Sequence, residues 1–119
     1  MYRLTERRFA RAKPILDKYR ERLHTAGDIS AGELERELRD CWGVGYQALK
    51  GIIEDLAKRN HYRYLAAYYM EHSSAPGVVS EFKPVLAKMY GIRSYGHSPD
   101  RESKREAFWQ GMKSARPGK

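Results

Sequence analysis

Apolar residues recur at three- and four-residue intervals along the first half of the chain, which is the period of an amphipathic helix. The first stripe predicts a helix over residues 5–24. Because Pro14 lies inside that range, an alternative is a helix that begins near Lys13, with the proline in the first turn, where its missing N–H costs nothing. A second helix is predicted to begin at Ala31. A third helix would bury a stripe formed by Leu49, Ile52, Ile53 and Leu56.

The start of the second helix and the turn after it have the clearest local signals. Ser30 and Glu33 have the spacing of a capping box, in which the Ser30 hydroxyl accepts from the Glu33 N–H and the Glu33 carboxylate accepts from the Ser30 N–H. Gly43 and Gly45 then break the helix, because glycine can adopt the positive φ angles of a tight turn. Asn60 is predicted to end the third helix in the left-handed conformation. Three short helices with such a turn indicate a helix-turn-helix unit.

Residues 61–82 allow two interpretations. The tyrosine-rich segment 61–70 can alternate as a strand, turn, and return as a second strand over residues 78–82. It can equally continue as a helix, since it contains good helix formers such as Leu65 and Ala66 and neither glycine nor proline. Short apolar runs are ambiguous by period alone, and we expect the β-hairpin.

The remainder of the chain predicts two more short helices. One covers residues 84–90. After a linker, Pro99 is predicted to lie in the first turn of a helix that ends near Met112. This organisation gives one domain over residues 1–91 and a C-terminal region over residues 92–119, which holds the linker, the short helix and a basic tail.

Residues 15–62 resemble the winged helix-turn-helix superfamily, which includes bacterial, archaeal and phage DNA-binding regulators. Three pieces carry the resemblance: the apolar residues from Ile15 to Leu23, the helix start Ile29-Ser30-x-x-Glu33-Leu34, and the segment Leu49-x3-Ile53-x2-Leu56-x3-Asn60-x-Tyr62. The resemblance implies a mainly α fold with a small β-hairpin wing, a winged helix-turn-helix extended by additional C-terminal helices. An all-α fold is the alternative.

The resemblance also implies where DNA would lie. In this superfamily the third helix enters the major groove with its N-terminal residues at base edges, and the wing lies along the backbone or minor groove. Carried onto this chain, the base-reading residues are Tyr46, Gln47 and Lys50, although Tyr46 also falls on the buried stripe. Gln47 can pair with adenine, and Lys50 can donate to guanine or to a phosphate. Arg63, in the expected wing, would contact a phosphate.

The charge distribution favours an acidic partner. The chain has 23 Lys and Arg against 15 Asp and Glu, which gives a net charge of +8. Residues 1–27 contribute eight basic and three acidic side chains (+5), whereas residues 28–60 contribute five and seven (−2). The alternative to nucleic-acid binding is a solvated helix face that nearby acidic side chains partly neutralise. The expected phosphate contacts in the first helix are Arg7, Arg8, Arg11 and Lys13.

No feature of the sequence supports catalysis, a cofactor or a bound metal. The four histidines lack metal-site spacing, no glycine-rich phosphate loop is present, and no nucleophile has an adjacent base. Tyr68 and Tyr69 resemble the paired nucleophilic tyrosines of DNA-nicking enzymes, but the His-x-His motif of those enzymes is lacking. Together with Tyr62 and Tyr64, they allow a stacking platform for unpaired bases, although such tyrosines more often divide between core and surface.

The single cysteine, Cys41, cannot form an internal disulfide, which fits a reducing cytosol. No apolar run is long enough for a signal peptide or a membrane span. These observations predict a non-enzymatic, cytoplasmic protein that binds duplex DNA and regulates transcription or a mobile element, with a homodimer as a further assembly.

The alternative function is a winged-helix protein-interaction module, such as a phage or assembly adaptor, without specific DNA binding. It is motivated by the acidic middle of the chain and by an aromatic set on the last helix. That set can anchor a partner or dock on its own domain. Its members are Phe108, Trp109 and Met112.

Overall fold

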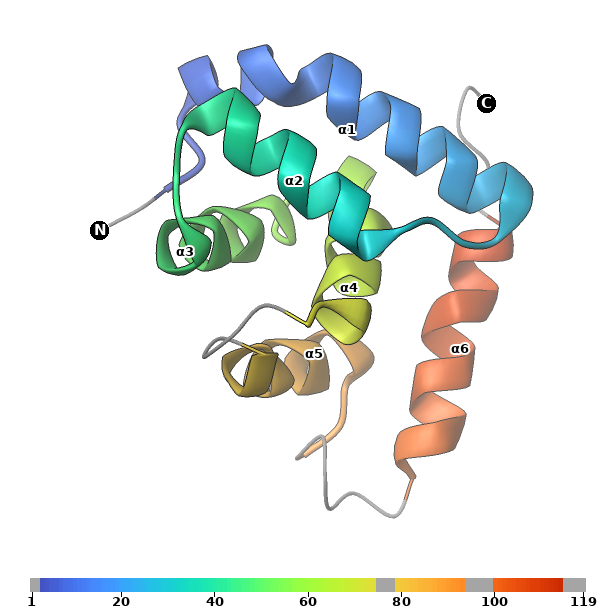
Figure 1. Ribbon diagram of the computed structural model, residues 1–119. Coiled ribbons are helices and arrows are strands. Elements are labelled where there is room, and N and C mark those ends of the chain that lie inside the picture. Colours follow the sequence, from blue (N-terminus) through green and yellow to red (C-terminus); the bar gives the residue numbers. More distant parts are fainter. Residues whose placement is uncertain (1–2, 75–78, 94–99, 115–119) are drawn as a thin grey trace.

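The computed structural model describes residues 3–74, 79–93 and 100–114, which fold into an all-α arrangement (Figure 1). The helices, in chain order, are α1 (Glu6–Ala26), α2 (Ala31–Trp42), α3 (Tyr46–Leu56), the short 3-10 helix η1 (Asn60–Tyr62), α4 (Arg63–His72), the short 3-10 helix η2 (Val79–Phe82), α5 (Lys83–Tyr90) and α6 (Arg101–Ser114). The described ranges contain no strand, so the all-α alternative fits them. None of their helices is long and apolar enough to cross a membrane.

α1 begins directly after its capping residue, Thr5, and continues through Pro14. Thr5 caps the helix, with Oγ1 accepting from the Arg8 N–H at 3.2 Å, and Gly27 ends it with a left-handed φ of 83°. Pro14 is exposed, and its helical position is opposite the buried stripe that includes Leu16. A carbonyl that loses its helical partner on that side can bond to water instead. Because α1 begins at Glu6, the alternative start near residue 13 is wrong.

α2 and α3 are joined by the tight turn that the sequence predicts. The Glu33 N–H donates to Ser30 Oγ at 3.2 Å, which is the first half of the expected capping box. The reciprocal bond from the Ser30 N–H to the Glu33 carboxylate is not formed between these described residues. Gly43 ends α2 with a φ of 64°, whereas Gly45 has a φ of −92° and is the N-cap of α3. Only the first glycine of the turn therefore uses the left-handed region.

The β-hairpin expected over residues 61–82 is wrong, because the chain forms η1 and α4 there. Leu65, Ala66 and Ala67 are consecutive and are each at most 1% exposed. A strand would turn alternate side chains to opposite faces, whereas a central helix can bury consecutive residues when its neighbours surround it. α4 has this position, since it packs against α1, α2, α3 and α5. Residues 75–78, at the tip of the expected hairpin, lie outside the described residues.

The end of α3 also differs from the prediction. Asn60 is not left-handed, since the positive φ angles among the described residues belong to glycines alone. It begins η1, in which the Tyr62 N–H donates to the Arg59 carbonyl at 3.0 Å. The right-handed 3-10 turn leads directly into α4 and replaces the expected start of a wing.

The last two helices follow their predicted positions closely. α5 covers the expected segment and ends at Gly91, which has a left-handed φ of 76°. α6 packs against α5, and its Phe108 and Met112 are each 7% exposed. A Cβ at Gly111 would lie 2.8 Å from Tyr64 Oη, so α6 approaches α4 closely at this position. Pro99, the expected first-turn proline, lies outside the described residues.

Four buried tyrosines donate their hydroxyls to carboxylates on other helices. This arrangement lets a large apolar ring enter the core while its hydroxyl remains hydrogen-bonded. Burial and the hydrogen bond to Glu37 raise the pKa of Tyr19 to about 12, and burial likewise raises the pKa of Tyr62, Tyr69 and Tyr90. Tyr62 and Tyr69 are therefore core residues and not an exposed stacking platform. The pairs are Tyr19–Glu37, Tyr62–Asp17, Tyr69–Glu35 and Tyr90–Glu71.

Candidate nucleic-acid interface

Among the described residues, no side chain caps the backbone N–H groups in the first turn of α3. Gly45 occupies the N-cap and has no side chain that could accept from them, and the first turn contains no acidic residue. Gly45 and Gln47 are both exposed. Unpaired N–H groups and the helix dipole give this end of α3 a partial positive charge, which favours a phosphate. The turn before α3 therefore presents a helix end suited to an anion.

Arg39 fixes the turn before α3, a role that the sequence pattern did not reveal. Its Nε donates to the Val44 carbonyl at 3.3 Å, and its guanidinium carbon lies 4.1 Å from the centre of the Tyr46 ring. Its Nη1 is 3.9 Å from a Glu35 carboxylate oxygen. The four-residue spacing of this last pair was the only signal in the sequence, and it is common on exposed helix faces. Tyr46 is half-buried beneath the guanidinium and is not free to reach a base.

Gln47 and Lys50 both lie on the outer side of α3, but their surroundings differ. Gln47 is exposed and makes no side-chain hydrogen bond within the described part of the chain. Lys50 Nζ lies 2.9 Å from Glu54 Oε2 and 3.5 Å from Glu81 Oε1. The hydrogen bond to Glu54, together with the charge of Glu81, raises the pKa of Lys50 above its ordinary value. Of the three residues predicted to read bases, Gln47 is thus the one that faces solvent without a partner.

Two of the four cations predicted to contact phosphates in α1 remain uncommitted. The side chains of Arg7 and Arg11 are exposed and make no hydrogen bond or ion pair within residues 3–74, 79–93 and 100–114. Arg8 Nη1 donates to a nearby backbone carbonyl at 2.8 Å. Lys13 Nζ lies 2.7 Å from Asp17 Oδ2, so the expected neutralisation by acidic neighbours applies to this cation.

The N-terminal end of α1 lies beside the turn that leads into α3. α1 and α2 run antiparallel, because Lys18 Nζ is 3.0 Å from Glu37 Oε1 while, further toward the start of α1, the Arg8 carbonyl accepts from Trp42 Nε1 at 2.9 Å. Figure 1 shows the start of α1, the turn and α3 at the same end of the molecule. The segment just before α1 also contacts the end of α3, where the Leu4 N–H donates to Asp55 Oδ2 at 2.9 Å. The segment of α1 that holds the uncommitted arginines therefore lies in the same region of the protein as α3 and the turn before it.

Arg63 is the first residue of α4, which forms where a strand of the wing was expected. Its guanidinium carbon is 5.0 Å from the ring centre of Tyr64 and 5.1 Å from that of Phe108. Its Nε is buried and has no hydrogen-bond partner among the described residues. The side chain thus contributes to the packing between α4 and α6.

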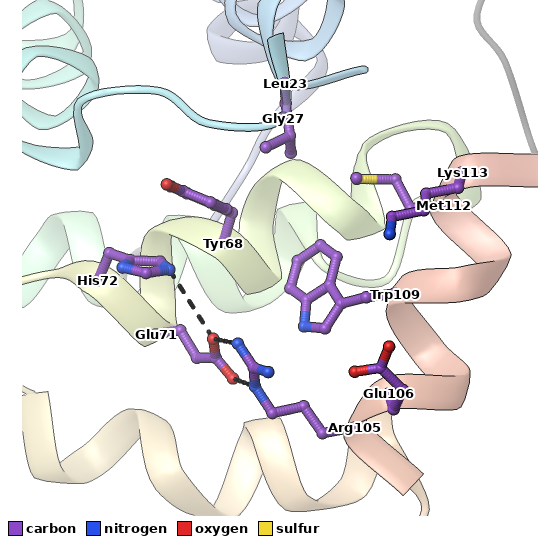
Figure 2. Close-up of a pocket in the computed structure, with 10 residues that line it drawn as sticks. All are labelled: Leu23, Gly27, Tyr68, Glu71, His72, Arg105, Glu106, Trp109, Met112 and Lys113. Atoms are coloured by element: carbon purple, nitrogen blue, oxygen red, sulfur yellow. Dashed lines mark hydrogen bonds and ion pairs between the residues drawn. The ribbon is translucent and has the colours of Figure 1, made fainter. Parts of the chain in front are cut away.

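A cavity of about 200 Å³ lies between the end of α1, α4 and α6 (Figure 2). Arg105 forms a two-pronged contact with Glu71 at 2.6 and 2.7 Å, and the Tyr90 hydroxyl donates to the same carboxylate at 2.5 Å. Burial alone would raise the pKa of the Glu71 carboxyl, but the hydrogen bonds from Arg105 and Tyr90 outweigh it and lower this pKa below its ordinary value. A carboxylate with a lowered pKa is a poor general base, so the cluster is better suited to holding α6 than to catalysis.

The aromatic set on α6 faces this cavity and the core. Phe108 and Met112 are buried against the protein's own helices, and half-buried Trp109 projects into the cavity beside Tyr68 (Figure 2). The structure thus shows the set docked on its own domain. Tyr68 also stacks on His72, with ring centres 4.1 Å apart.

Within the described ranges, no group of three or more His, Cys, Asp or Glu side chains is arranged to hold a metal ion. Comparisons of the chain with protein-family models, curated proteins and solved structures found no match. The geometry and charge of the molecule are therefore the basis on which its function is proposed.

Proposed function

We propose that the protein is a non-enzymatic regulator that binds double-stranded DNA, with the first turn of α3 toward the major groove and the start of α1 on the phosphates. The observation that carries the proposal is the open first turn of α3, together with the start of α1, which holds Arg7 and Arg11 and lies at the same end of the molecule as α3 (Figure 1). Both arginines are exposed and without ion pairs in the described part of the chain. A helix N-terminus and two free guanidinium groups are suited to neighbouring phosphates.

The contacts that this surface offers are mainly with the DNA backbone. Gln47 is the exposed candidate for base reading, while Tyr46 lies beneath Arg39 and Lys50 lies between two carboxylates. Phosphate contacts set the position of a protein on DNA but carry little sequence information. We therefore expect strong dependence on salt and a modest preference for sequence.

The test is a titration of duplex DNA at several salt concentrations, using fluorescence anisotropy. In the double variant Arg7→Gln/Arg11→Gln, the salt dependence of the binding constant should become shallower by about two ions, because each lost phosphate contact removes about 0.9 from the slope. The matched control is Lys88→Gln/Lys104→Gln, which removes two exposed charges from α5 and α6.

The control should change the slope by less than half as much as the arginine variant. Absence of binding by the unaltered protein at low salt would refute the proposal. Equal effects of the two double variants would also refute it, because binding would then depend on total charge and not on the end of the molecule that carries α3.

A protein-binding role is a second candidate, favoured by the balanced charge on the outer side of α3. There the ammonium of Lys50 is matched by the carboxylates of Glu54 and Glu81. Such a surface is less suited to phosphates than a basic one. A protein partner that is retained after nuclease treatment, together with no affinity for duplex DNA, would favour this role.

A further inference from the structure

Lys50 is held by two carboxylates that come from different parts of the chain. Glu54 lies four residues along the same helix and therefore moves with it. Glu81 belongs to η2, which comes after α4 in the sequence and lies outside the helix-turn-helix unit. The contact between Lys50 and Glu81 thus places a negative charge from a distant segment on the side of α3 that the proposed function turns toward DNA.

This contact limits what Lys50 can offer to a phosphate. The Lys50 side chain is only 21% exposed, and both of its ion pairs lie within 3.5 Å. A phosphate that approached Lys50 would meet the charge of Glu81 or would have to displace it. The Glu81 side chain is 45% exposed, and ion pairs at this degree of exposure are weak, so displacement into solvent is feasible.

We propose that Glu81 is a built-in competitor of DNA: its carboxylate takes the place of a phosphate at Lys50 and lowers the affinity of α3 for the duplex. The inference rests on the proposed function and adds a means by which the affinity is set. A phosphate oxygen reaches Lys50 only in those complexes in which the Glu81 carboxylate has moved away, and Lys50 then keeps its pair with Glu54. The contact with η2 then limits the number of phosphates that α3 engages.

The test compares Glu81→Gln with Glu102→Gln in DNA titrations over a range of salt. Both variants raise the net charge by one and remove one carboxylate from an ion pair, since Glu102 is an exposed residue of α6 that lies 3.2 Å from Arg101. The second variant therefore measures the effect of the same change away from α3. At about 0.1 M salt, Glu81→Gln should bind duplex DNA on the order of 3- to 10-fold more tightly and steepen the salt dependence by about one ion, since one phosphate contact adds about 0.9 to the slope. Glu102→Gln should change the affinity less than twofold, as total charge alone has a weaker effect at this salt.

A second measurement links the effect to Lys50. In a Lys50→Gln background, the gain from Glu81→Gln should fall to the level of the Glu102→Gln control, because the group that Glu81 releases is no longer present. A gain that persists in this background would overturn the inference. Circular dichroism of each variant checks that the helices remain folded.

The outcomes also separate this inference from the proposed function. If the unaltered protein binds DNA and Glu81→Gln resembles Glu102→Gln, the competitor role fails and DNA binding stands. If only Glu81→Gln binds, both are supported. If neither protein binds at low salt, the proposed function fails and the inference falls with it.

Discussion

Gly43 and Gly45 are separated by one residue, yet a side chain would be strained at Gly43 and tolerated at Gly45. Gly43 has a φ of 64°, where an L-residue is strained, whereas Gly45 has a φ of −92° and caps α3 without a side chain. Gly43→Ser should lower the free energy of unfolding by about 1–2 kcal/mol. Gly45→Ser should raise it by a few tenths of a kcal/mol, roughly the advantage of serine over glycine as an N-cap.

Denaturant titrations of both variants measure these changes. A Cβ at either glycine meets no atom within 4 Å, so a difference in sign must come from the backbone and the cap and not from crowding. Equal losses of stability in the two variants would contradict this account of the turn.

Single residues at helix ends were the best-predicted part of the structure. Ser30 caps α2 and Gly43 ends it, as their sequence neighbours indicated. Such signals are legible because a cap depends on backbone atoms within a few residues. Asn60 shows the limit of this rule, since its conformation depends on α4, whose formation the local sequence left open.

The carboxylate of Glu71 on α4 bonds to Arg105 of α6 and to Tyr90 of α5, and the Glu71 side chain is 6% exposed. Arg105→Met should remove the two-pronged contact, and with it the opposite charge, from a carboxylate that is almost fully buried. At neutral pH this should lower the free energy of unfolding by about 3 kcal/mol, the cost typical of breaking a buried ion pair. Lys104→Met, at an exposed neighbouring position, is the control and should change stability by less than about 0.5 kcal/mol.

The penalty of Arg105→Met should also depend on pH. The pKa of the Glu71 carboxyl lies below its ordinary value of 4.5 in the folded protein, so its ionised form contributes stability above that value. This contribution is lost as the pH falls below 4.5 and through the lower folded-state pKa. The gap in stability between the two proteins should therefore narrow in acid. A gap that stays constant from neutral to acid pH would show that Glu71 does not carry the effect.

A helix that is surrounded by other helices was harder to predict than a helix with one buried and one exposed side. The stripes of α1 and α3 appeared in the sequence because one side of each helix is buried. α4 buries Leu65, Ala66 and Ala67 together, which removes the contrast between polar and apolar sides on which periodicity depends. α4 packs against α1, α2, α3 and α5, and the local sequence pattern does not reveal these contacts.

Across the whole molecule, the four tyrosine–carboxylate bonds join α1 to α2 and to η1, α2 to α4, and α4 to α5. Burial and these carboxylates raise the tyrosine pKa values, to about 12 for Tyr19, above the ordinary value of 10. The neutral hydroxyl therefore contributes stability that is fully present below pH 10 and is lost as the pH rises toward the folded-state pKa.

We expect alkaline unfolding in which these tyrosines ionise together with loss of helix. Absorbance of tyrosinate and circular dichroism, followed in the same pH titration, should change in parallel above pH 10. Tyr19→Phe should make the alkaline loss of stability less steep, because one linked proton is removed. Gradual ionisation with the helices intact would contradict this linkage.

At the same scale, the sequence predicted the buried stripe of α3 but not the surroundings of its other residues. The resemblance assigned Gln47 and Lys50 to base reading; Gln47 is exposed, whereas the Lys50 side chain is 21% exposed and lies between two carboxylates. The pairing of Lys50 with Glu81, by contrast, depends on how η2 meets α3, and the stacking of Arg39 on Tyr46 depends on the path of the turn. Contacts between distant segments follow from tertiary packing, which the pattern of a single segment does not encode.

The two tryptophans lie at different ends of the molecule and can serve as intrinsic fluorescence probes. Trp42 donates to the Arg8 carbonyl near the start of α1, and Trp109 lies in the cavity that Leu23 lines near the end of that helix. At 1.5 Å per helical residue, the stretch of α1 between them is on the order of 20 Å long. Because indole emission responds to polarity and to nearby groups, Trp109→Phe leaves a signal from the end of the molecule that carries the turn before α3. Trp42→Phe leaves a signal from the site where α6 packs. Events at the two ends can therefore be followed separately in unlabelled protein.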